Sequence, residues 1–562
     1  MREEEAGGAG GNGTSGRGDR WASLGIVVAA ATVAFWFGVR PRGGLGFVQD
    51  EHAYLFQADT LLQGRLALPP PPVPEAFEAP HLLVEPRYAA KYYPGHALLL
   101  APFRLAGAAW VWPCLAFGVV AALCFRAARQ SDSGWAAFAA PACLVGSGPL
   151  LVYFPTFLAH SSAAVLALGA LTLADGRRRR EALAVGCLLG LLLLTRPLSA
   201  IAASLAVAPS VLGRRRWQDR ACFAAPIVVA AAVAAVVNWR VTGDAMLPPW
   251  LLWAREYAPF DGPGIGPLAR VEPLRPLPPH FAYVVDRYWA TRSAYTWSAL
   301  PGVALERLRV LATFLPSPQV ALLAGAGIGL LWRPGPARRI VVFGLLLFLL
   351  QLTFHATLAQ YSVEIAPIWA VLVAFGIATL VRLWQRGPPR TQAAVVAVAC
   401  ALELAAYRWF FGLAAVAAFP LLFLGASGLL AAIRGWPARA ARVLLLAAAC
   451  GLVAAAVPGL GVEYRRYVGV LRSDWDQLAA FDHALQPLRD RPALVLVRYR
   501  LPVELHLPIA NPRLWRGEPG LVVAVEREPY SSELVERLPD HAPFIWDAAG
   551  RVLLRRTASP AR

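Results

Sequence analysis

Length, composition and charge together exclude an ordinary soluble protein. The chain has 562 residues, of which 57% are hydrophobic and 16% are charged, and its mean hydropathy is +0.50. Soluble domains carry about 25% charged residues. The net charge of +18 would suit nucleic-acid binding in a soluble protein, but the basic residues lie mostly in short loops between apolar runs. We therefore expect a membrane protein with lipids, and no nucleic acid, as partners.

The predicted elements begin with a Gly-rich stretch, and we expect residues 1–21 to be a disordered cytoplasmic tail. Residues 22–461 are predicted to form a transmembrane domain, because apolar runs of about 17 to 25 residues recur along them. The fold class that this pattern predicts is an all-α polytopic membrane protein with about 13 transmembrane helices. The candidate spans are 22–40, 97–125, 134–153, 156–174, 182–195, 197–212, 221–239, 317–332, 340–355, 362–382, 391–407, 410–433 and 443–461.

The arginines predict the orientation of these spans. They gather in short loops that fall on alternate sides of successive spans. If those loops face the cytoplasm, the N-terminus of this multi-pass protein of the cell membrane is cytoplasmic, and an odd number of spans makes the C-terminus extracytoplasmic. The first long segment (residues 41–96), the second long segment (residues 240–316) and residues 462–562 then share the outer side.

Residues 462–562 are predicted to form a small extracytoplasmic α/β domain. Apolar and polar patches alternate there, and strands are expected near 493–498, 521–526 and 551–555.

The first long segment contains the polar residues with the clearest chemical pattern. Asp50 and Glu51 follow the first span by about ten residues, and so are expected near the membrane interface. Lys91, the single lysine of the chain, begins the run Lys-Tyr-Tyr-Pro-Gly-His that leads into the next apolar run. A carboxylate can act as a general base, and a lysine can stabilise the charge that develops on a departing phosphate.

This pattern resembles the GT-C glycosyltransferases, in particular the protein O-mannosyltransferase and aminoarabinose transferase group with its galacturonosyl-transferase-like bacterial members. The resemblance is strongest over residues 45–105, with weaker similarity at 195–197, 238–249 and 360–367. It implies a membrane glycosyltransferase that moves a sugar from a polyprenyl-phosphate donor to an envelope glycan, lipid or protein acceptor on the outer face of the membrane.

The resemblance also implies roles for individual residues. Asp50 looks like the family's catalytic base, and Glu51 is a second catalytic candidate. Lys91 looks like the lysine that contacts the donor phosphate, and Arg87 and Arg196 are further candidates for that contact. Candidates for substrate binding are Tyr54, Tyr93, His96 and Tyr361. Related sequences often place an arginine before this last tyrosine, where Gln360 stands here, which weakens a phosphate-binding role at that position.

No residue spacing argues for a metal site, so no metal ligands are predicted. The seven cysteines have neither CxxC nor Cys/His spacing. His52, Glu85 and His96 lie close together in the sequence, and a divalent metal ion stays open as a cofactor.

Other interpretations of the same residues stay open. Asp50 and Glu51 could form a solvated pair at the start of a surface helix, and Lys91 could extend toward lipid headgroups. The chain could instead be a transporter or flippase for lipid-linked glycans, which would place the essential polar residues inside the spans. It could also be a non-catalytic envelope-assembly protein that acts through residues 462–562.

Overall fold

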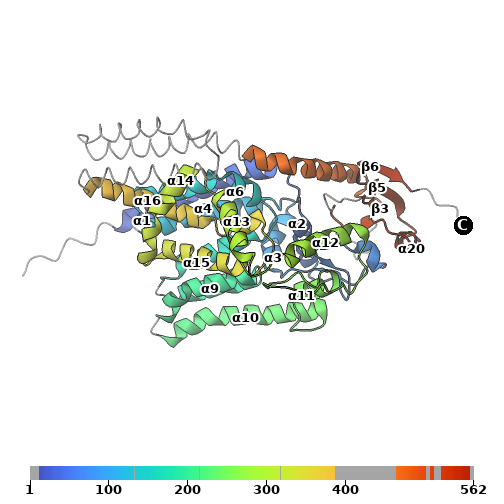
Figure 1. Cartoon of the computed structure of the whole chain (residues 1–562), viewed down its shortest axis with the longest axis horizontal. Coiled ribbons are helices and arrows are strands. Elements are labelled where there is room, and N and C mark those ends of the chain that lie inside the picture. Colours follow the sequence, from blue (N-terminus) through green and yellow to red (C-terminus); the bar gives the residue numbers. More distant parts are fainter. Residues whose placement is uncertain are drawn as a thin grey trace, which may run out of the picture.

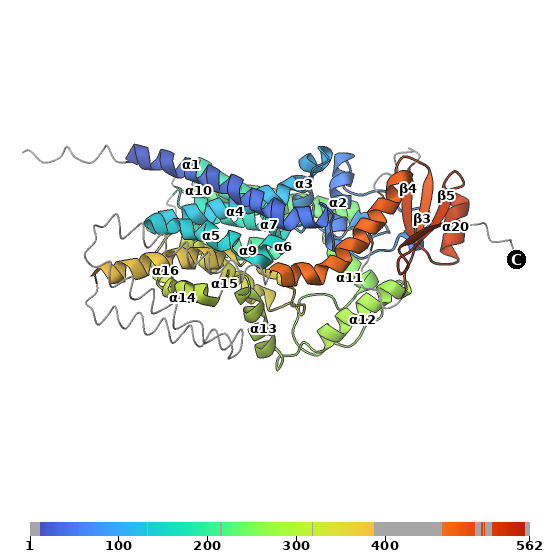
Figure 2. The same cartoon turned by 90° about the horizontal axis from the view of Figure 1, so that it is seen from above.

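The computed structural model describes residues 12–131, 133–176, 178–213, 216–316, 318–386, 464–500, 507–509, 511 and 520–556. Helices dominate, and the longer ones run side by side along the long axis of the molecule (Figures 1 and 2). A small sheet lies at one end, and a group of shorter helices and loops lies between the sheet and the long helices (Figure 2).

The helical body is formed by α1 (Asn12–Ala34), α4 (Val111–Gln130), α5 (Ala139–Val145), α6 (Gly148–Tyr153), α7 (His160–Leu173), α8 (Arg179–Leu193), α9 (Pro197–Leu212), α10 (Trp217–Thr242), α14 (Pro318–Ala326), α15 (Pro336–Gln351) and α16 (Pro367–Arg386). The group between body and sheet is formed by α2 (Gln49–Leu62), α3 (Gly95–Leu105), α11 (Pro249–Tyr257), α12 (Pro279–Ser293) and α13 (Leu300–Ala312).

The prediction of about 13 spans is not confirmed over the described residues. Three helical stretches are long and apolar enough to cross a membrane, namely Gly18–Arg42, Val111–Gln130 and Trp217–Thr242. A fourth is reached if the pair Leu323–Trp332 and Pro336–Gln351, bent by 104°, is one span. Four further helices are apolar but shorter. The predicted spans 391–407, 410–433 and 443–461 lie outside the described residues.

Two predicted spans are wrong as single helices because their backbone breaks. The stretch 97–125 is divided between α3 and α4. Gly107 lies between them with a left-handed φ of +71°, a backbone conformation that ends an α-helix. The stretch 134–153 is divided between α5 and α6, and the hydroxyl of Ser147 accepts a hydrogen bond from the backbone of Leu150 at 3.3 Å to start the second helix.

Glycines allow the helices of the body to pack closely. A Cβ at Gly118 of α4 would overlap the carbonyl oxygen of Val27 in α1, and one at Gly186 of α8 would overlap that of Phe223 in α10. Backbone contacts of this kind are typical of helix pairs within membranes, where small residues let two helices approach closely and van der Waals packing favours their association.

The C-terminal part contains a four-stranded sheet in the order β4-β3-β5-β6. The strands are β3 (Ala493–Arg498), β4 (Leu521–Val525), β5 (Ala542–Asp547) and β6 (Val552–Arg555), with α20 (Tyr530–Arg537) between β4 and β5. β3 is parallel to both neighbours, and β6 is antiparallel to β5. Three of these strands lie where the sequence predicts them, whereas β5 was not predicted. A helix over residues 464–485 precedes the sheet.

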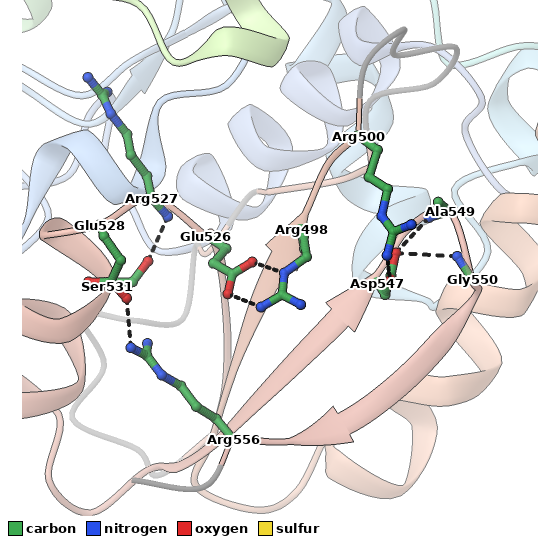
Figure 3. Close-up of polar contacts among 10 residues, drawn as sticks. All are labelled: Arg498, Arg500, Glu526, Arg527, Glu528, Ser531, Asp547, Ala549, Gly550 and Arg556. Atoms are coloured by element: carbon green, nitrogen blue, oxygen red, sulfur yellow. Dashed lines mark hydrogen bonds and ion pairs between the residues drawn. The ribbon is translucent and has the colours of Figure 1, made fainter. Parts of the chain in front are cut away.

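Ion pairs join the segments at the ends of different strands of the sheet (Figure 3). Arg500 lies 2.8 Å from Asp547, and Arg556 lies 2.7 Å from Glu528. At least one partner in each pair is exposed, so each contributes little to stability.

The sheet shares a hydrophobic core with the first long segment. Apolar side chains of β3 and β4 and of residues 464–485 pack in one cluster with Phe56, Phe77 and Tyr88. The hydroxyl of Tyr88 also donates to the carbonyl of Ile509 at 3.3 Å. The first long segment is therefore held between the helical body and the sheet.

Buried Glu78 connects three parts of the chain that are distant in sequence. Its carboxylate lies 3.2 Å from Arg275 of the second long segment and 2.9 Å from Arg527, which follows β4. Burial raises the pKa of Glu78, and the two arginines oppose that shift. This carboxylate ties the first long segment to its two neighbours.

Candidate active site

The candidate site is formed around Asp50, in the first turn of α2. Val48 precedes the helix in an extended conformation, and carboxylates are favoured in the first turn by the helix dipole. The apolar side of α2 buries Ala53, Tyr54 and Phe56, so this helix is packed inside the protein. Asp50 lies one turn before Ala53 and Tyr54, at the open end of this helix, and its side chain is 34% exposed.

Two neighbours bond to the carboxylate of Asp50. The hydroxyl of Tyr92 donates to Oδ1, and Nε2 of His81 lies 3.3 Å from Oδ2. Burial raises the pKa of Asp50, but His81, Tyr92 and Lys91 outweigh burial and hold that pKa well below its usual range. Asp50 is therefore ionised at neutral pH, and each oxygen keeps a lone pair for a further donor.

A short hairpin brings His81 and Lys91 to Asp50. Its strands are β1 (Leu82–Leu83) and β2 (Ala89–Ala90), paired antiparallel with Leu82 opposite Ala90. The same register places His81 opposite Lys91, whose backbone N–H donates to the carbonyl of His81 at 3.0 Å. Sequence reasoning missed His81, because strands of two residues leave no recognisable periodic pattern.

Lys91 provides a positive charge beside this carboxylate. Its side chain is buried, and Nζ lies 3.7 Å from the ring centroid of Trp253 in α11. Burial lowers the pKa of Lys91, and Asp261 and Asp50 oppose that shift. No carboxylate of the described residues lies within 4 Å of Nζ, so an aromatic face holds the ammonium and its charge is left without a close anion.

Glu51 occupies a different environment from its neighbour Asp50. It is fully buried, lies 3.4 Å from Nη1 of Arg42, and accepts hydrogen bonds from the backbone N–H groups of Phe47 at 3.2 Å and Phe157 at 2.8 Å. Burial raises the pKa of Glu51, while Arg42 and these N–H groups oppose that shift. The structure places its carboxylate in the interior, away from the exposed face of Asp50.

The predicted phosphate ligands Arg87 and Arg196 are placed differently from each other. Arg87 is exposed at the turn of the hairpin, at the end opposite Lys91, because the two strands carry it away from the site. Arg196 precedes α9, with Nε 2.8 Å from Oε1 of Glu364 and its side chain 22% exposed. Only Arg196 is therefore oriented by a partner from another part of the chain.

Glu364 is the centre of a second polar cluster, which the sequence analysis missed. It is fully buried, its Oε1 lies 2.7 Å from Nδ1 of His160, and the hydroxyl of Ser199 donates to Oε2. The imidazole of His160 also contacts the ring of Tyr361 at 5.7 Å between centroids. The cluster joins three helical regions, and its carboxylate holds the guanidinium of Arg196 at Nε.

Two of the predicted substrate-binding tyrosines lie between Asp50 and this cluster. Tyr54 is buried and stacks on Tyr92 with ring centroids 4.4 Å apart. Tyr361 is half-buried, and burial and the charge of Asp50 raise its pKa to about 12, with Arg196 opposing. The charges of Asp50 and Arg196 thus both affect the pKa of the Tyr361 hydroxyl.

The other two residues predicted to bind substrate, His96 and Tyr93, each have a partner within the protein. His96 is fully buried, with Nδ1 2.7 Å from the hydroxyl of Ser162 and Nε2 2.7 Å from the carbonyl of Phe157. Both ring nitrogens of His96 are therefore occupied by partners inside the protein. Tyr93 is half-buried beside the second long segment, where it bonds to Asn238.

Within the described ranges, no group of three or more His, Cys, Asp or Glu residues is arranged to hold a metal ion.

The chain is similar to several solved structures. No model of a known protein family and no curated protein matches it. ArnT from Cupriavidus metallidurans bound to undecaprenyl phosphate matches with a TM-score of 0.45 and 16% identity, over 94% of this chain and 93% of that one. Arabinosyltransferase EmbB from Mycobacterium smegmatis matches with a TM-score of 0.46 and 14% identity, over 83% of this chain and 42% of that one.

A further similar structure is the archaeal oligosaccharyltransferase AglB from Archaeoglobus fulgidus, with a TM-score of 0.35 and 12% identity, over 69% of this chain and 54% of that one. All three are GT-C glycosyltransferases, the superfamily that the first long segment resembles. At these values the likeness is a distant one, and the roles of the residues are inferred from this chain alone.

Proposed function

We propose that this chain is a membrane glycosyltransferase that moves a sugar from a polyprenyl-phosphate donor to a hydroxyl group of an envelope glycan, lipid or protein acceptor on the outer face of the membrane. The observation that carries the proposal is that Asp50 and Lys91 are near enough for their charges to interact. The first is an ionised, partly exposed carboxylate of α2. The second is a lysine with no carboxylate of the described residues within 4 Å, carried by the hairpin that also carries His81.

The proposed reaction uses these two charges in one step. Asp50 takes the proton of the acceptor hydroxyl while the acceptor oxygen forms a bond to the anomeric carbon of the sugar. The bond between that carbon and the phosphate oxygen breaks, and polyprenyl phosphate leaves with the bonding electron pair. Lys91 stabilises the charge that develops on the phosphate, and Arg196 is proposed to assist it from the side of Glu364.

Other residues of the site are assigned to support. Glu51 and Arg42 hold the start of α2 in place, and with it Asp50. Tyr54, Tyr92 and Tyr361 lie near Asp50 and Arg196 and are assigned to the sugar, because aromatic faces and hydroxyls suit a sugar ring. Arg87 has no part in this proposal. A divalent metal ion is not required by it, because one base and a good leaving group suffice.

The test compares a strain lacking the gene with strains that carry the wild type or Asp50→Asn at matched membrane levels. Mass spectrometry would measure envelope glycans and lipid-linked sugars in each. We expect one sugar to disappear from the acceptor in the deletion strain, its lipid-phosphate donor to persist, and wild type alone to restore the product. Restoration by Asp50→Asn would remove Asp50 as the base.

One observation favours the alternative of a transporter for lipid-linked glycans. The buried group of Glu364, Arg196 and His160 lies among apolar helices, and ionisable residues in such places often mark a transport pathway. A transporter would lose function with Glu364→Gln and tolerate Asp50→Asn. Loss of the product with Asp50→Asn in a well-inserted protein would exclude it.

A further inference from the structure

His81 is held in an unusual conformation next to Asp50. Its φ is +67°, in the left-handed region that residues other than glycine rarely adopt. Backbone strain of this kind persists only where the surroundings impose it, and it is concentrated at functional sites. The carbonyl of His81 accepts from Lys91, and its ring lies between Trp253 and Tyr92, with centroids at 5.5 Å and 5.9 Å.

The polar atoms of the His81 ring have a single described partner. Nε2 lies 3.3 Å from Oδ2 of Asp50, whereas Nδ1 is buried without a hydrogen bond among the described residues. Burying an imidazole costs free energy unless its nitrogens are bonded, and an apolar ring would fill the same space between aromatic neighbours without that cost. The contact with Asp50 is therefore what a histidine adds at this position.

The charge state of His81 decides how many protons its ring carries, and Asp50 decides where one of them lies. Burial lowers the pKa of His81, Asp50 opposes this, and nearby Lys91 lowers the pKa further. The ring is therefore neutral near pH 7 and carries one proton. A carboxylate only accepts hydrogen bonds, so that proton is on Nε2 and is donated to Oδ2.

We propose that His81 is a positioning residue for the transfer reaction: its Nε2–H holds Oδ2 of Asp50, as the Tyr92 hydroxyl holds Oδ1, and the two together turn the free lone pairs toward the acceptor hydroxyl. The inference rests on the proposed function, because it assigns His81 a task in that reaction. His81 itself takes no proton from substrate.

Removing this donor has a predictable effect on Asp50. Without His81 the ionised form loses one hydrogen bond, so the pKa of Asp50 rises toward its ordinary value. Activity that requires the carboxylate is lost as pH falls through that pKa, so the acid limb of the pH profile moves to higher pH. The other titratable groups that interact with the charge of Asp50 are Tyr54, Lys91, Tyr92, His160, Tyr288 and Tyr361, and the substitution at His81 removes none of them.

The experiment uses the full chain, purified in detergent, as wild type, His81→Ala, His81→Gln and His52→Ala. Glutamine keeps an N–H donor, and His52 is a neighbouring histidine that makes no contact with Asp50. Carbodiimide and an amine label carboxyl groups in their protonated form, and peptide mass spectrometry at pH 5 gives the labelling rate of Asp50 relative to Asp59 of the same helix. The transfer rate is measured against pH in parallel.

We expect His81→Ala to label Asp50 roughly tenfold faster than wild type, the factor that one pKa unit gives above the pKa. His81→Gln should stay near wild type, and His52→Ala should match it. Buried Glu51 serves as a control for folding, because it is labelled only if the protein opens. In the transfer assay, kcat of His81→Ala should fall with its acid limb displaced upward, while KM for the lipid donor stays unchanged.

Equal labelling of Asp50 in wild type and His81→Ala, with Glu51 protected in both, would overturn the inference. A wild-type protein that transfers no sugar would overturn the proposed function instead, and the labelling rates would still decide whether His81 holds Asp50.

Discussion

Asp50 and Glu364 are two carboxylates that each lie beside a histidine, but they differ in how accessible their oxygen atoms are. Glu364 is fully buried and is engaged by His160, Arg196 and Ser199. Asp50 is 34% exposed and has two neutral donors. Both are held as anions, but only Asp50 has accessible lone pairs for an incoming hydroxyl. Accessibility therefore separates the carboxylate that can take a proton from the one that holds a cation in place.

Replacing Glu364 by Gln should have the largest effect on stability. The change leaves Arg196 without its anion and His160 without its charged partner, and breaking a buried ion pair costs about 3–5 kcal/mol. Thermal unfolding in detergent would measure it against Asp50→Asn as a matched carboxylate-to-amide change, which should cost less because Asp50 is partly exposed. If both variants lost the same free energy of unfolding, burial would not distinguish Glu364 from Asp50.

Glu51→Gln tests whether the neighbour of Asp50 belongs with Glu364 rather than with Asp50. Arg42 would lose its carboxylate in the interior, but it keeps a hydrogen bond to the carbonyl of Pro155, so we expect a loss of about 3 kcal/mol. The transfer rate per folded molecule should fall much less than in Asp50→Asn. A stable but inactive Glu51→Gln protein would show instead that Glu51 takes part in the chemistry.

Lys91→Met tests the proposed contact with the phosphate of the lipid-linked sugar donor. A charged hydrogen bond to phosphate contributes about 1.5–3 kcal/mol, so KM for the lipid donor should rise by about 10- to 100-fold if Lys91 binds it in the ground state. Arg87→Met is the matched control, because Arg87 is exposed at the far end of the same hairpin. Steady-state kinetics over a range of donor concentrations would measure both, and similar changes would contradict the role of Lys91.

The smallest effect is expected at Asp59, the third carboxylate of α2. It forms two hydrogen bonds of 2.9 Å with Arg104, but both side chains are partly exposed, so Arg104→Ala should cost only about 0.2–1 kcal/mol. Thermal unfolding would check this value, and the transfer rate should not change. A loss of stability as large as that of Glu51→Gln would mean that the exposure of a carboxylate of α2 does not determine its contribution to stability.

The sequence singled out the part of the candidate site that lies within one stretch of chain. Asp50 and Lys91 stand out by their residue types and their place beside the apolar runs, and the structure brings them together. His81 and Glu364 could not be found in this way, because their partners come from a hairpin register and from helices more than 150 residues apart.

The fold was predicted in kind but not in detail. Long apolar runs indicated helices correctly, whereas breaks such as Gly107 divided two of them, since hydropathy does not report backbone conformation. The strands β3, β4 and β6 followed from apolar patches bounded by turns. The antiparallel partner of β6 was missed, because β5 begins with Ala-Pro and is only partly buried.

The most direct test of the central claim is release of polyprenyl phosphate by the purified protein. Lipid-linked sugars extracted from the deletion strain would serve as donors, with wild type and Asp50→Asn compared at equal folded concentration. Loss of a general base typically costs about 10²–10⁴-fold in rate, so we predict release and sugar transfer by wild type and a rate lower by that factor for Asp50→Asn. Equal release by the two proteins would contradict the account.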